Sequence, residues 1–372
     1  MCAVHAGPDA APFPTSRVGR MLHPAGLERL APEGDSVNDL TFGLNRRPFG
    51  SVKQLTDTVR REEALGFDYA WFPDSHLRRP DAFILAALTL QATERLHSGP
   101  LLANPITRHP VTLASAAATL GVIGPGRAAV GIGAGDTAVS TIGERPAKVA
   151  EVREALQLVR RLLEGEAPDL GSRLPARRLG TPGKAEIWGA ASGPRAAQAA
   201  GAAADVIVLR CGLHPANLNA LADAAEAGAR DAGRDPAGLR FGAIVHTLIE
   251  DDPGWAAAQA CVVAAGFYEL AAQTWQRPGF AWNGPPIHEL AAQVYPDIVH
   301  AEDLPAAAEL TSFVQPEVAR WFALAGDAAA VAEGLRRVRD GFPRLWHVIP
   351  QPLTWKRDFP ERVTGVIQRL RG

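Results

Sequence analysis

Short apolar runs alternate with longer amphipathic or alanine-rich segments along most of this chain. The short runs predict strands, and the longer segments, with apolar residues three and four positions apart, predict helices. The strands expected on this basis are residues 40–44, 67–72, the run that leads from 96 to Asn104, 127–132, 185–190, 206–209, 241–249 and 345–349.

A helix is expected after nearly every one of these strands. The clearest is the helix that follows the fourth strand, because Val149, Val152, Leu156, Val159 and Leu163 form one apolar stripe that ends before Gly165. Alternation of short strands with helices indicates a parallel sheet. Eight such units favour an α/β fold of the (β/α)8 TIM barrel type, which needs roughly 250 residues. A doubly wound open sheet is the alternative.

Three segments depart from the alternation. Residues 1–38 contain Pro14, Pro24 and Pro32 and are interpreted as an N-terminal extension, and residues 166–184 as an irregular excursion rich in Pro, Gly and Arg. Residues 254–320 contain helical pieces and several aromatic side chains, and are interpreted as a mostly helical insertion between strands seven and eight. We therefore expect a single barrel domain over residues 39–372.

Composition narrows the class of protein. Of the 372 residues, 47% are hydrophobic and 21% are charged, with a formal net charge of -2, so nucleic acid is not an expected partner. No apolar run approaches the ~20 residues that span a bilayer, so no membrane partner is expected. The three cysteines form no CxxC pair and the ten histidines no HExxH motif, so no metal site is predicted. A reducing, cytoplasmic location fits this cysteine content.

Candidate proton-transfer residues follow two of the predicted strands. Asp74 and His76 come after the second strand, and Asp136 comes after the fourth. Because the carboxyl ends of barrel strands share one rim, we expect these three side chains to converge there. Carboxylates and an imidazole within hydrogen-bond reach can transfer a proton near neutral pH.

A glycine-rich loop precedes Asp136. Gly131, Gly133 and Gly135 resemble the dinucleotide fingerprint GxGxxG, but Asp136 occupies the position of its third glycine, and no acidic residue ends a strand about 20 residues later. A Rossmann site is therefore disfavoured, and we interpret the loop as backbone that closely approaches a flat ring. The polar segment Asn104 to His109 after the third strand is expected to hold a ring carbonyl or a cofactor tail.

A phosphate site is expected where the fifth strand gives way to a helix. The sequence there is Ala190-Ala191-Ser192-Gly193-Pro194. Backbone N–H groups at a helix N-terminus favour an anion, and the Ser192 hydroxyl can add a donor.

Three motifs in order carry a family resemblance. They are NPITRHP, then GIGAGDTAVSTIG with RPAKVAEVREALQLVRRLLEGE, and then IWGAASGPRAAQAAGAAADVIVL. They resemble the bacterial-luciferase-like superfamily, and within it the branch of methylene-tetrahydromethanopterin reductases. The resemblance covers roughly residues 40–250 and, more weakly, 322–350. It implies a (β/α)8 barrel with an insertion, commonly a homodimer, and a flavin-type cofactor, either coenzyme F420 or FMN.

The resemblance also implies roles by position. It implies a non-prolyl cis peptide within Leu101 to Asn104, and it places Asp74 at an acidic position after strand two and Asp136 near the reacting carbon. Relatives often have His directly after that Asp, whereas here Ser75 intervenes before His76. The implied cofactor-binding residues are Leu102, Ala103, Asn104, Gly133, Ala134, Gly135, Ala190, Ala191, Ser192 and Gly193. The segment around Asn104 would contact the cofactor, the loop Gly133 to Thr137 would lie near the ring and ribityl chain, and Ala191 to Pro194 would hold the phosphate.

The function expected from the residues and the resemblance together is oxidoreduction of a small-molecule substrate. Hydride would pass between F420 and a small organic compound, with Asp74, His76 or Asp136 supplying the proton. The alternatives are an FMN-dependent luciferase-like monooxygenase that uses molecular oxygen, and a barrel that binds a small molecule without turnover. The aromatic residues Trp275, Phe280, Trp282 and Tyr295 are expected to shape a substrate pocket or a dimer face.

Overall fold

The computed structural model describes residues 39–45 and 51–372, so the expected extension, residues 1–38, lies outside the described residues. The strands are β1 (Thr41–Leu44), β2 (Tyr69–Phe72), β3 (His97–Pro100), β4 (Ala129–Ile132), β5 (Glu186–Ala191), β6 (Val206–Leu209), β7 (Arg240–Ile249), β8 (Ala323–Gly326) and β9 (Leu345–Gln351).

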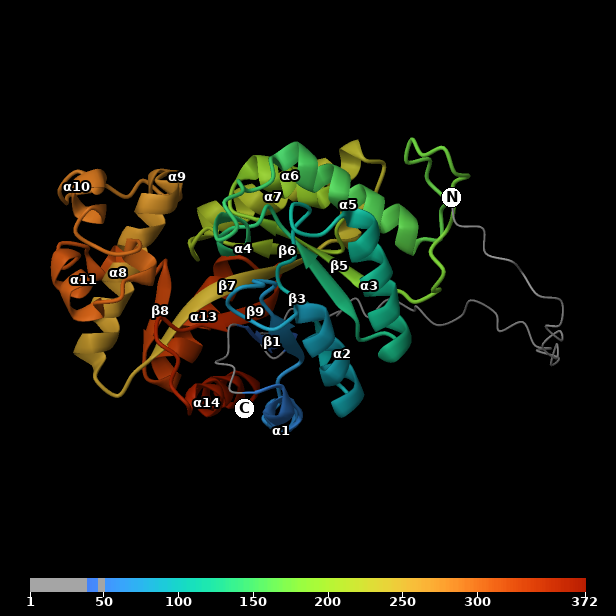
Figure 1. The fold of residues 1–372 in the computed structure, drawn as a ribbon. Coiled ribbons are helices and arrows are strands. Elements are labelled where there is room, and N and C mark those ends of the chain that lie inside the picture. Colours follow the sequence, from blue (N-terminus) through green and yellow to red (C-terminus); the bar gives the residue numbers. More distant parts are fainter. Residues whose placement is uncertain (1–38, 46–50) are drawn as a thin grey trace, which may run out of the picture. The chain divides into compact units, whose positions relative to one another are not determined.

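Eight of these strands form the expected parallel barrel (Figure 1). They pair in the order β3-β2-β1-β9-β7-β6-β5-β4. Bridges from Ser98 to Ala128 and from Ala103 to Ile132 bring the third and fourth strand segments together and nearly close the circle. The (β/α)8 prediction is confirmed, and the doubly wound alternative is wrong. In this order β3, β4 and β5 lie across the barrel from β7, β9 and β1.

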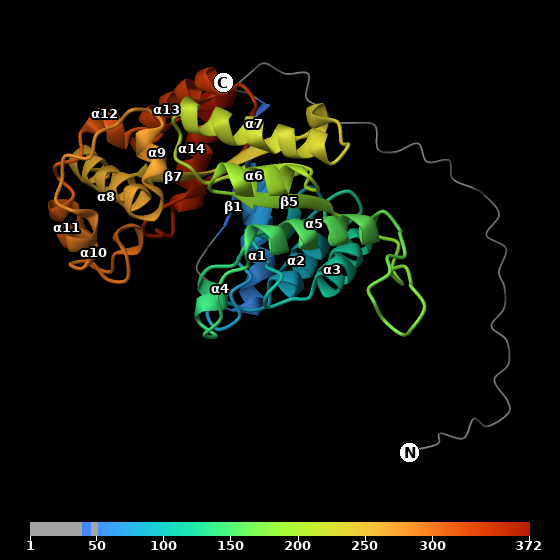
Figure 2. The same cartoon turned by 90° about the horizontal axis from the view of Figure 1, so that it is seen from above.

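Helices follow the strands, and those outside the insertion cover the barrel. They are α1 (Val52–Ala64), α2 (Ala82–Ala92), α3 (Pro110–Ile123), α4 (Thr137–Ser140), α5 (Val149–Leu163), α6 (Pro194–Gly201), α7 (Pro215–Asp231), α8 (Pro253–Ala271), α9 (Gln273–Gln276), α10 (Ile287–Ala291), α11 (Leu304–Leu310), α12 (Pro316–Ala319), α13 (Ala328–Gly341) and α14 (Phe359–Arg371). Local chemistry fixes several starts: the Asp81 carboxylate accepts from the N–H groups of Phe83 and Ile84, and the Asp327 carboxylate accepts from that of Ala330. Figure 2 shows α1, α2 and α3 side by side on the outside of the barrel.

The insertion is mostly helical, as expected, and contains α8 to α12 (Figure 1). It has its own buried cluster, which includes Phe267, Trp275 and Phe322. The sequence analysis missed one strand at its end. Residues Ala323–Gly326 form β8, which pairs in parallel with His246–Ile249, the C-terminal end of β7. A four-residue run of Ala, Leu and Gly carries too little β-branched or aromatic character to predict a strand.

Aromatic side chains fill the barrel interior near the strand starts. Tyr69 and Trp71 stack with ring centroids 4.9 Å apart, and Trp188 meets Trp71 edge to face at 4.6 Å. The Trp71 indole N–H donates to Nε2 of His347 (3.3 Å), so the other ring nitrogen, Nδ1, carries the proton and donates to Thr41 Oγ1 at 2.7 Å. A ligand can therefore enter only at the opposite end of the barrel.

The ionisable side chains among these aromatic residues are either in ion pairs or uncharged. Arg240 forms an ion pair with Glu186 and lies 4.3 Å from the Trp346 ring. Burial, together with Arg127 and Arg240, lowers the pKa of His97 to about 4. Burial likewise holds the pKa of His347 well below its usual value. Both imidazoles are therefore neutral at pH 7.

Two further features concern the described residues only. No helix among them is long and apolar enough to cross a bilayer. Residues 166–184 contain no helix or strand, as expected, and form a loop that projects beyond the C-terminal end of α5 (Figure 2).

Candidate active site

One wall of the barrel mouth is apolar and comes from β3, β4 and β5. A Cβ atom at Gly131 or Gly133 would lie 2.9 Å from a methyl group of Leu102, so only glycine at both positions leaves room for that side chain. Leu102 is half-buried, and Ala190 lies beside Gly133. The expected cis peptide is present between Leu101 and Leu102. This wall, formed by Leu102, Gly133 and Ala190, offers a flat apolar surface.

Asn104 lies next to this wall and has one unused donor. Its Oδ1 atom accepts hydrogen bonds from the N–H groups of Ile106 and Thr107 and from the Thr107 hydroxyl. The residue is only 1% exposed, and its buried Nδ2 atom has no hydrogen-bond partner among the described residues. A buried amide donor without an acceptor is costly, so this atom is suited to a ligand acceptor.

Gly135 brings the glycine loop against Asn104. Its φ of +85° lies in the left-handed region, and a Cβ there would lie 2.3 Å from Val139 Cγ2 and 3.2 Å from Asn104 Cγ. Its neighbour Ala134 is exposed, and Asp136 is exposed at the N-terminus of α4 without capping it through its side chain.

Asp74 is buried at the end of β2 and held by Arg108. Arg108 donates from Nε to Asp74 Oδ2 at 2.7 Å and from Nη2 to Oδ1 at 2.9 Å, and also from Nη2 to Asp81 Oδ2 at 2.6 Å. These two carboxylates raise the pKa of Arg108. Burial acts against ionisation of Asp81, but the bonds from Arg108 and from the Ile84 and Phe83 N–H groups hold its pKa below the usual value. Arg108 therefore fixes the loop after β3 to the loop after β2.

The structure joins two of the three expected proton-transfer residues. His76 Nδ1 lies 3.6 Å from Asp74 Oδ1, and the His76 side chain is 32% exposed. No ion pair connects Asp136 to Asp74 or His76 among the described residues. Their convergence as a set of three stays a prediction.

The expected phosphate position lies at the end of β5. Ser192 is exposed, and Gly193 directly precedes α6, whose first residue is Pro194. The sequence analysis did not single out Arg210. Arg210 comes two positions after the inward-facing Val208, so it lies on the inner side of the barrel. Its backbone N–H donates to Ala191 O at 2.9 Å, which places it beside the end of β5. Its side chain is in no ion pair with a described residue.

Three polar side chains line the opposite wall, and the sequence analysis missed all of them. The inward face of β7 carries Gly242 and Ile244 and then His246, while the inward face of β9 carries His347 and Ile349 and then Gln351. His246 and Gln351 are register partners, 2% and 8% exposed. The pairing of Thr41 with His347 brings Asn45, 8% exposed, level with Gln351. We call Asn45, His246 and Gln351 the polar arc. The signal available in the sequence is alternation along the strands, because His246 and Gln351 each follow an inward-facing isoleucine by two positions.

These residues fit a flat heterocycle with a phosphate tail. The apolar wall suits a ring face, and Asn104 Nδ2 suits a ring carbonyl. The start of α6, Ser192 and Arg210 suit the phosphate. The described residues include no group of three His, Cys, Asp or Glu side chains that could hold a metal ion.

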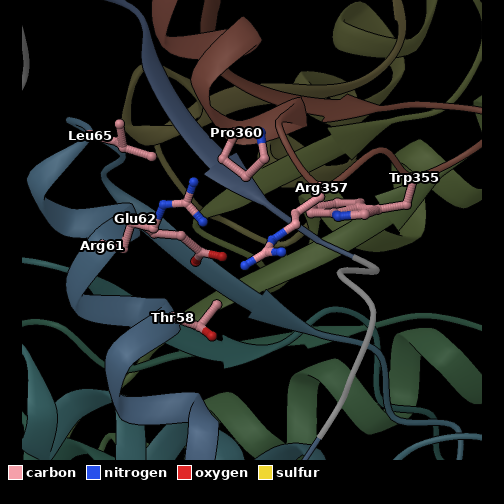
Figure 3. Close-up of a pocket in the computed structure, with 7 residues that line it drawn as sticks. All are labelled: Thr58, Arg61, Glu62, Leu65, Trp355, Arg357 and Pro360. Atoms are coloured by element: carbon pink, nitrogen blue, oxygen red, sulfur yellow. The ribbon is translucent and has the colours of Figure 1, made fainter.

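A cavity of about 360 Å³ lies elsewhere, between α1 and the segment that precedes α14 (Figure 3). The residues that line it include Arg61, Glu62, Trp355 and Arg357, and none of the expected site residues. It lies outside the barrel, so it is not the candidate active site.

Comparisons with known proteins identify the family of the chain. Residues 33–344 match the family model of the luciferase-like monooxygenases. A 5,10-methylenetetrahydromethanopterin reductase from Archaeoglobus fulgidus is 30% identical over 234 residues, which cover 61% of this chain and 69% of that protein. An F420-dependent hydroxymycolic acid dehydrogenase from Mycobacterium tuberculosis is 29% identical over 272 residues, 68% of either chain.

A solved structure shows the same fold. The coenzyme F420-dependent tetrahydromethanopterin reductase from Methanopyrus kandleri superposes with a TM-score of 0.68 at 23% identity, covering 88% of this chain and 97% of that one. The relatives by sequence are reductases and dehydrogenases, and this protein is an oxidoreductase. The chain belongs to the luciferase-like monooxygenase family.

Proposed function

We propose that this protein transfers hydride between coenzyme F420 and a small organic substrate. The observation that carries the proposal is the buried, unpartnered Nδ2 of Asn104 beside the apolar wall of Leu102, Gly133 and Ala190. Two relatives of known activity support the choice of cofactor, since one is described as F420-dependent and a solved structural neighbour is as well.

Each part of the mouth has a distinct task. Leu102 and Ala190 pack against one face of the ring and exclude water from it. Asn104 Nδ2 donates to a ring oxygen, and Gly135 allows the loop to approach because it has no Cβ. Ser192, the N–H groups at the start of α6 and Arg210 hold the phosphate. When bound, the deazaflavin supplies a carbon that gives or accepts hydride.

The substrate step requires one hydride and one proton. In the reducing direction a C–H bond forms at the substrate carbon, its π bond breaks, and the adjacent atom takes a proton while the cofactor is oxidised. Asp74 accepts two hydrogen bonds from Arg108, so its task is to position the loops. His76 and Asp136 remain as proton carriers, because both reach solvent.

A monooxygenase that uses FMN is the second candidate, and the description of the matched family favours it. The two are separated by whether oxygen is consumed. The purified protein is incubated with reduced F420 and candidate carbonyl substrates without oxygen, and in parallel with FMN, a flavin reductase and oxygen. Anaerobic oxidation of F420 that depends on the substrate supports hydride transfer, and substrate-dependent oxygen uptake with FMN alone contradicts it.

We also propose that the protein forms a homodimer through α2 and α3. Neither helix contains a charged residue, yet Ile84 is 61% exposed and Val122 is 53% exposed. The outward face of a surface helix normally carries charged residues, whereas the exposed positions here carry only Thr, Ser, Gln and apolar side chains. A second copy of the same uncharged face would cover both.

A further inference from the structure

The two walls of the barrel mouth differ in chemistry, and only one of them has been assigned to the cofactor. The wall from β3, β4 and β5 is apolar. The polar arc of Asn45, His246 and Gln351 lies directly across the barrel, on β1, β7 and β9. Any ring that rests on the apolar wall turns its other face toward this arc.

The members of the polar arc are held on the inner surface by strand pairing. His246 is level with Gln351, and the register of β1 with β9 brings Asn45 to the same height. Asn45 Nδ2 donates to Leu101 O at 3.1 Å, which fixes that amide beside the cis peptide. The arc is therefore a built surface of buried polar groups, in contrast to an exposed loop.

The insertion closes the space above the arc with apolar groups. Leu248, the next inward residue on β7, belongs to the buried cluster of the insertion. Phe267 from α8 meets the His246 ring edge to face, with centroids 5.9 Å apart. His246 thus lies where the barrel interior and the insertion core meet.

Two of the three arc residues are amides, which carry no charge. Amide groups hydrogen-bond an uncharged oxygen well, but they do not repay the cost of burying a carboxylate or an ammonium group. Arg210, a neighbouring cation, follows β6 beside the phosphate position. The arc therefore suits an uncharged oxygen whose carbon skeleton extends toward Phe267.

We propose that the polar arc binds the reacting oxygen of the substrate, and that the substrate is an uncharged ketone or secondary alcohol with an apolar skeleton. This inference rests on the proposed hydride transfer. The ketone carbon receives the hydride from the reduced cofactor, which is thereby oxidised. The C=O π electrons pass to the oxygen, which takes a proton from His76 or Asp136 and becomes a hydroxyl. Gln351 and His246 hold that oxygen toward the ring.

The test measures binding separately from turnover. Saturation-transfer NMR with the full chain compares acetophenone and cyclohexanone with benzoate and cyclohexanecarboxylate, which have the same rings. The wild type should bind the ketones at least tenfold more tightly than the carboxylates. Gln351→Leu and, as a second variant, His246→Leu should weaken ketone binding about tenfold, because each loses a hydrogen bond in a buried site.

Thr247→Val is the matched control, because it removes a polar group from the outward face of the same strand. It should leave ketone binding unchanged. Three results would overturn the inference. They are equal binding of ketones and carboxylates by the wild type, no ketone binding by the wild type, and ketone binding by both arc variants with the affinity of the wild type. A fluorescence titration with F420 on the same samples separates the two proposals. If the arc variants lose ketone binding but the wild type does not bind F420, the proposed cofactor is contradicted and the proposed role of the polar arc is supported.

Discussion

Arg108 holds Asp74 through two hydrogen bonds, and the Asp74 side chain is only 1% exposed. Without the Asp74 carboxylate, Arg108 keeps only the more exposed Asp81 as an ionic partner, and breaking a buried ion pair costs about 3 kcal/mol. Asp74→Asn should therefore lower the free energy of unfolding in urea by roughly that amount. If Asp74 instead acts only as a proton donor, the variant loses activity and keeps the stability of the wild type.

Asp81→Asn is the matched control for that experiment. Asn keeps the oxygen that caps α2, and the Asp81 side chain is 36% exposed. Loss of its charge opposite Arg108 should cost less than about 1 kcal/mol. If the two variants are equally destabilised, the burial of Asp74 does not make its ion pair with Arg108 stronger than that of Asp81.

Asn104→Asp tests the unused donor. The substituted side chain keeps an oxygen that can accept the three bonds from Ile106 and Thr107, and it replaces Nδ2 by a second oxygen. F420 binding should weaken at least tenfold, because an acceptor and a negative charge then face the ring oxygen. Thr107→Val, which removes one bond accepted by Asn104, should leave the affinity within about twofold. If Asn104→Asp binds F420 as tightly as the wild type, Asn104 Nδ2 does not contact the cofactor, which contradicts the proposed function.

Gly135→Ala tests the close approach of the glycine loop. The new Cβ would be 2.3 Å from Val139 Cγ2 and in a left-handed backbone conformation, so we expect a loss of stability of about 2 kcal/mol and weaker cofactor binding. Gly143→Ala has a similar φ of +77° with no atom within 4 Å, so it reports backbone strain alone, about 1 kcal/mol. Thermal unfolding and fluorescence titration measure both. Cofactor affinity that falls equally in the two variants would argue against a role for the loop.

Acid should destabilise the barrel through its buried imidazoles. Folding lowers the pKa of His97 from 6.5 to about 4, so the unfolded state binds a proton between these values and the folded state does not. Stability present above pH 6.5 is therefore lost as the pH falls toward 4, by roughly 3 kcal/mol from this residue. His97→Phe, which keeps the stacking on Tyr69, should reduce the loss measured by urea unfolding at pH 7 and pH 4.5. The same acid sensitivity in the variant would assign the effect to other groups.

The proposed dimer is tested by Ile84→Glu. A charge placed at the centre of an apolar interface should shift the protein from dimer to monomer in light scattering after gel filtration. Leu174→Glu changes an apolar residue that is 74% exposed in the 166–184 loop and should have no effect. A monomeric wild type would contradict the proposed pairing.

The sequence predicted the barrel because each strand is a short apolar run with a clear boundary. It did not predict β8, whose residues are small and pair with the C-terminal end of β7. The apolar wall was predictable from Gly131 and Gly133, although the side chain that fills their space, Leu102, depends on packing between strands.

The polar arc and the Asp74–Arg108 pair could not be found in the same way. Asp74 and Arg108 are 34 positions apart, and His246 and Gln351 are separated by the whole insertion. An isolated polar residue at a strand end indicates a rim position, but its partners depend on which strands become neighbours. Spatial pairing of that kind is a property of the closed barrel.

The central claim is that the barrel mouth binds a deazaflavin. The most direct measurement is a fluorescence titration of the purified protein with F420 and, separately, with FMN. The account predicts saturable binding of F420 that is at least tenfold tighter than that of FMN and is weakened by Asn104→Asp. Tight binding of FMN with no binding of F420 would contradict it.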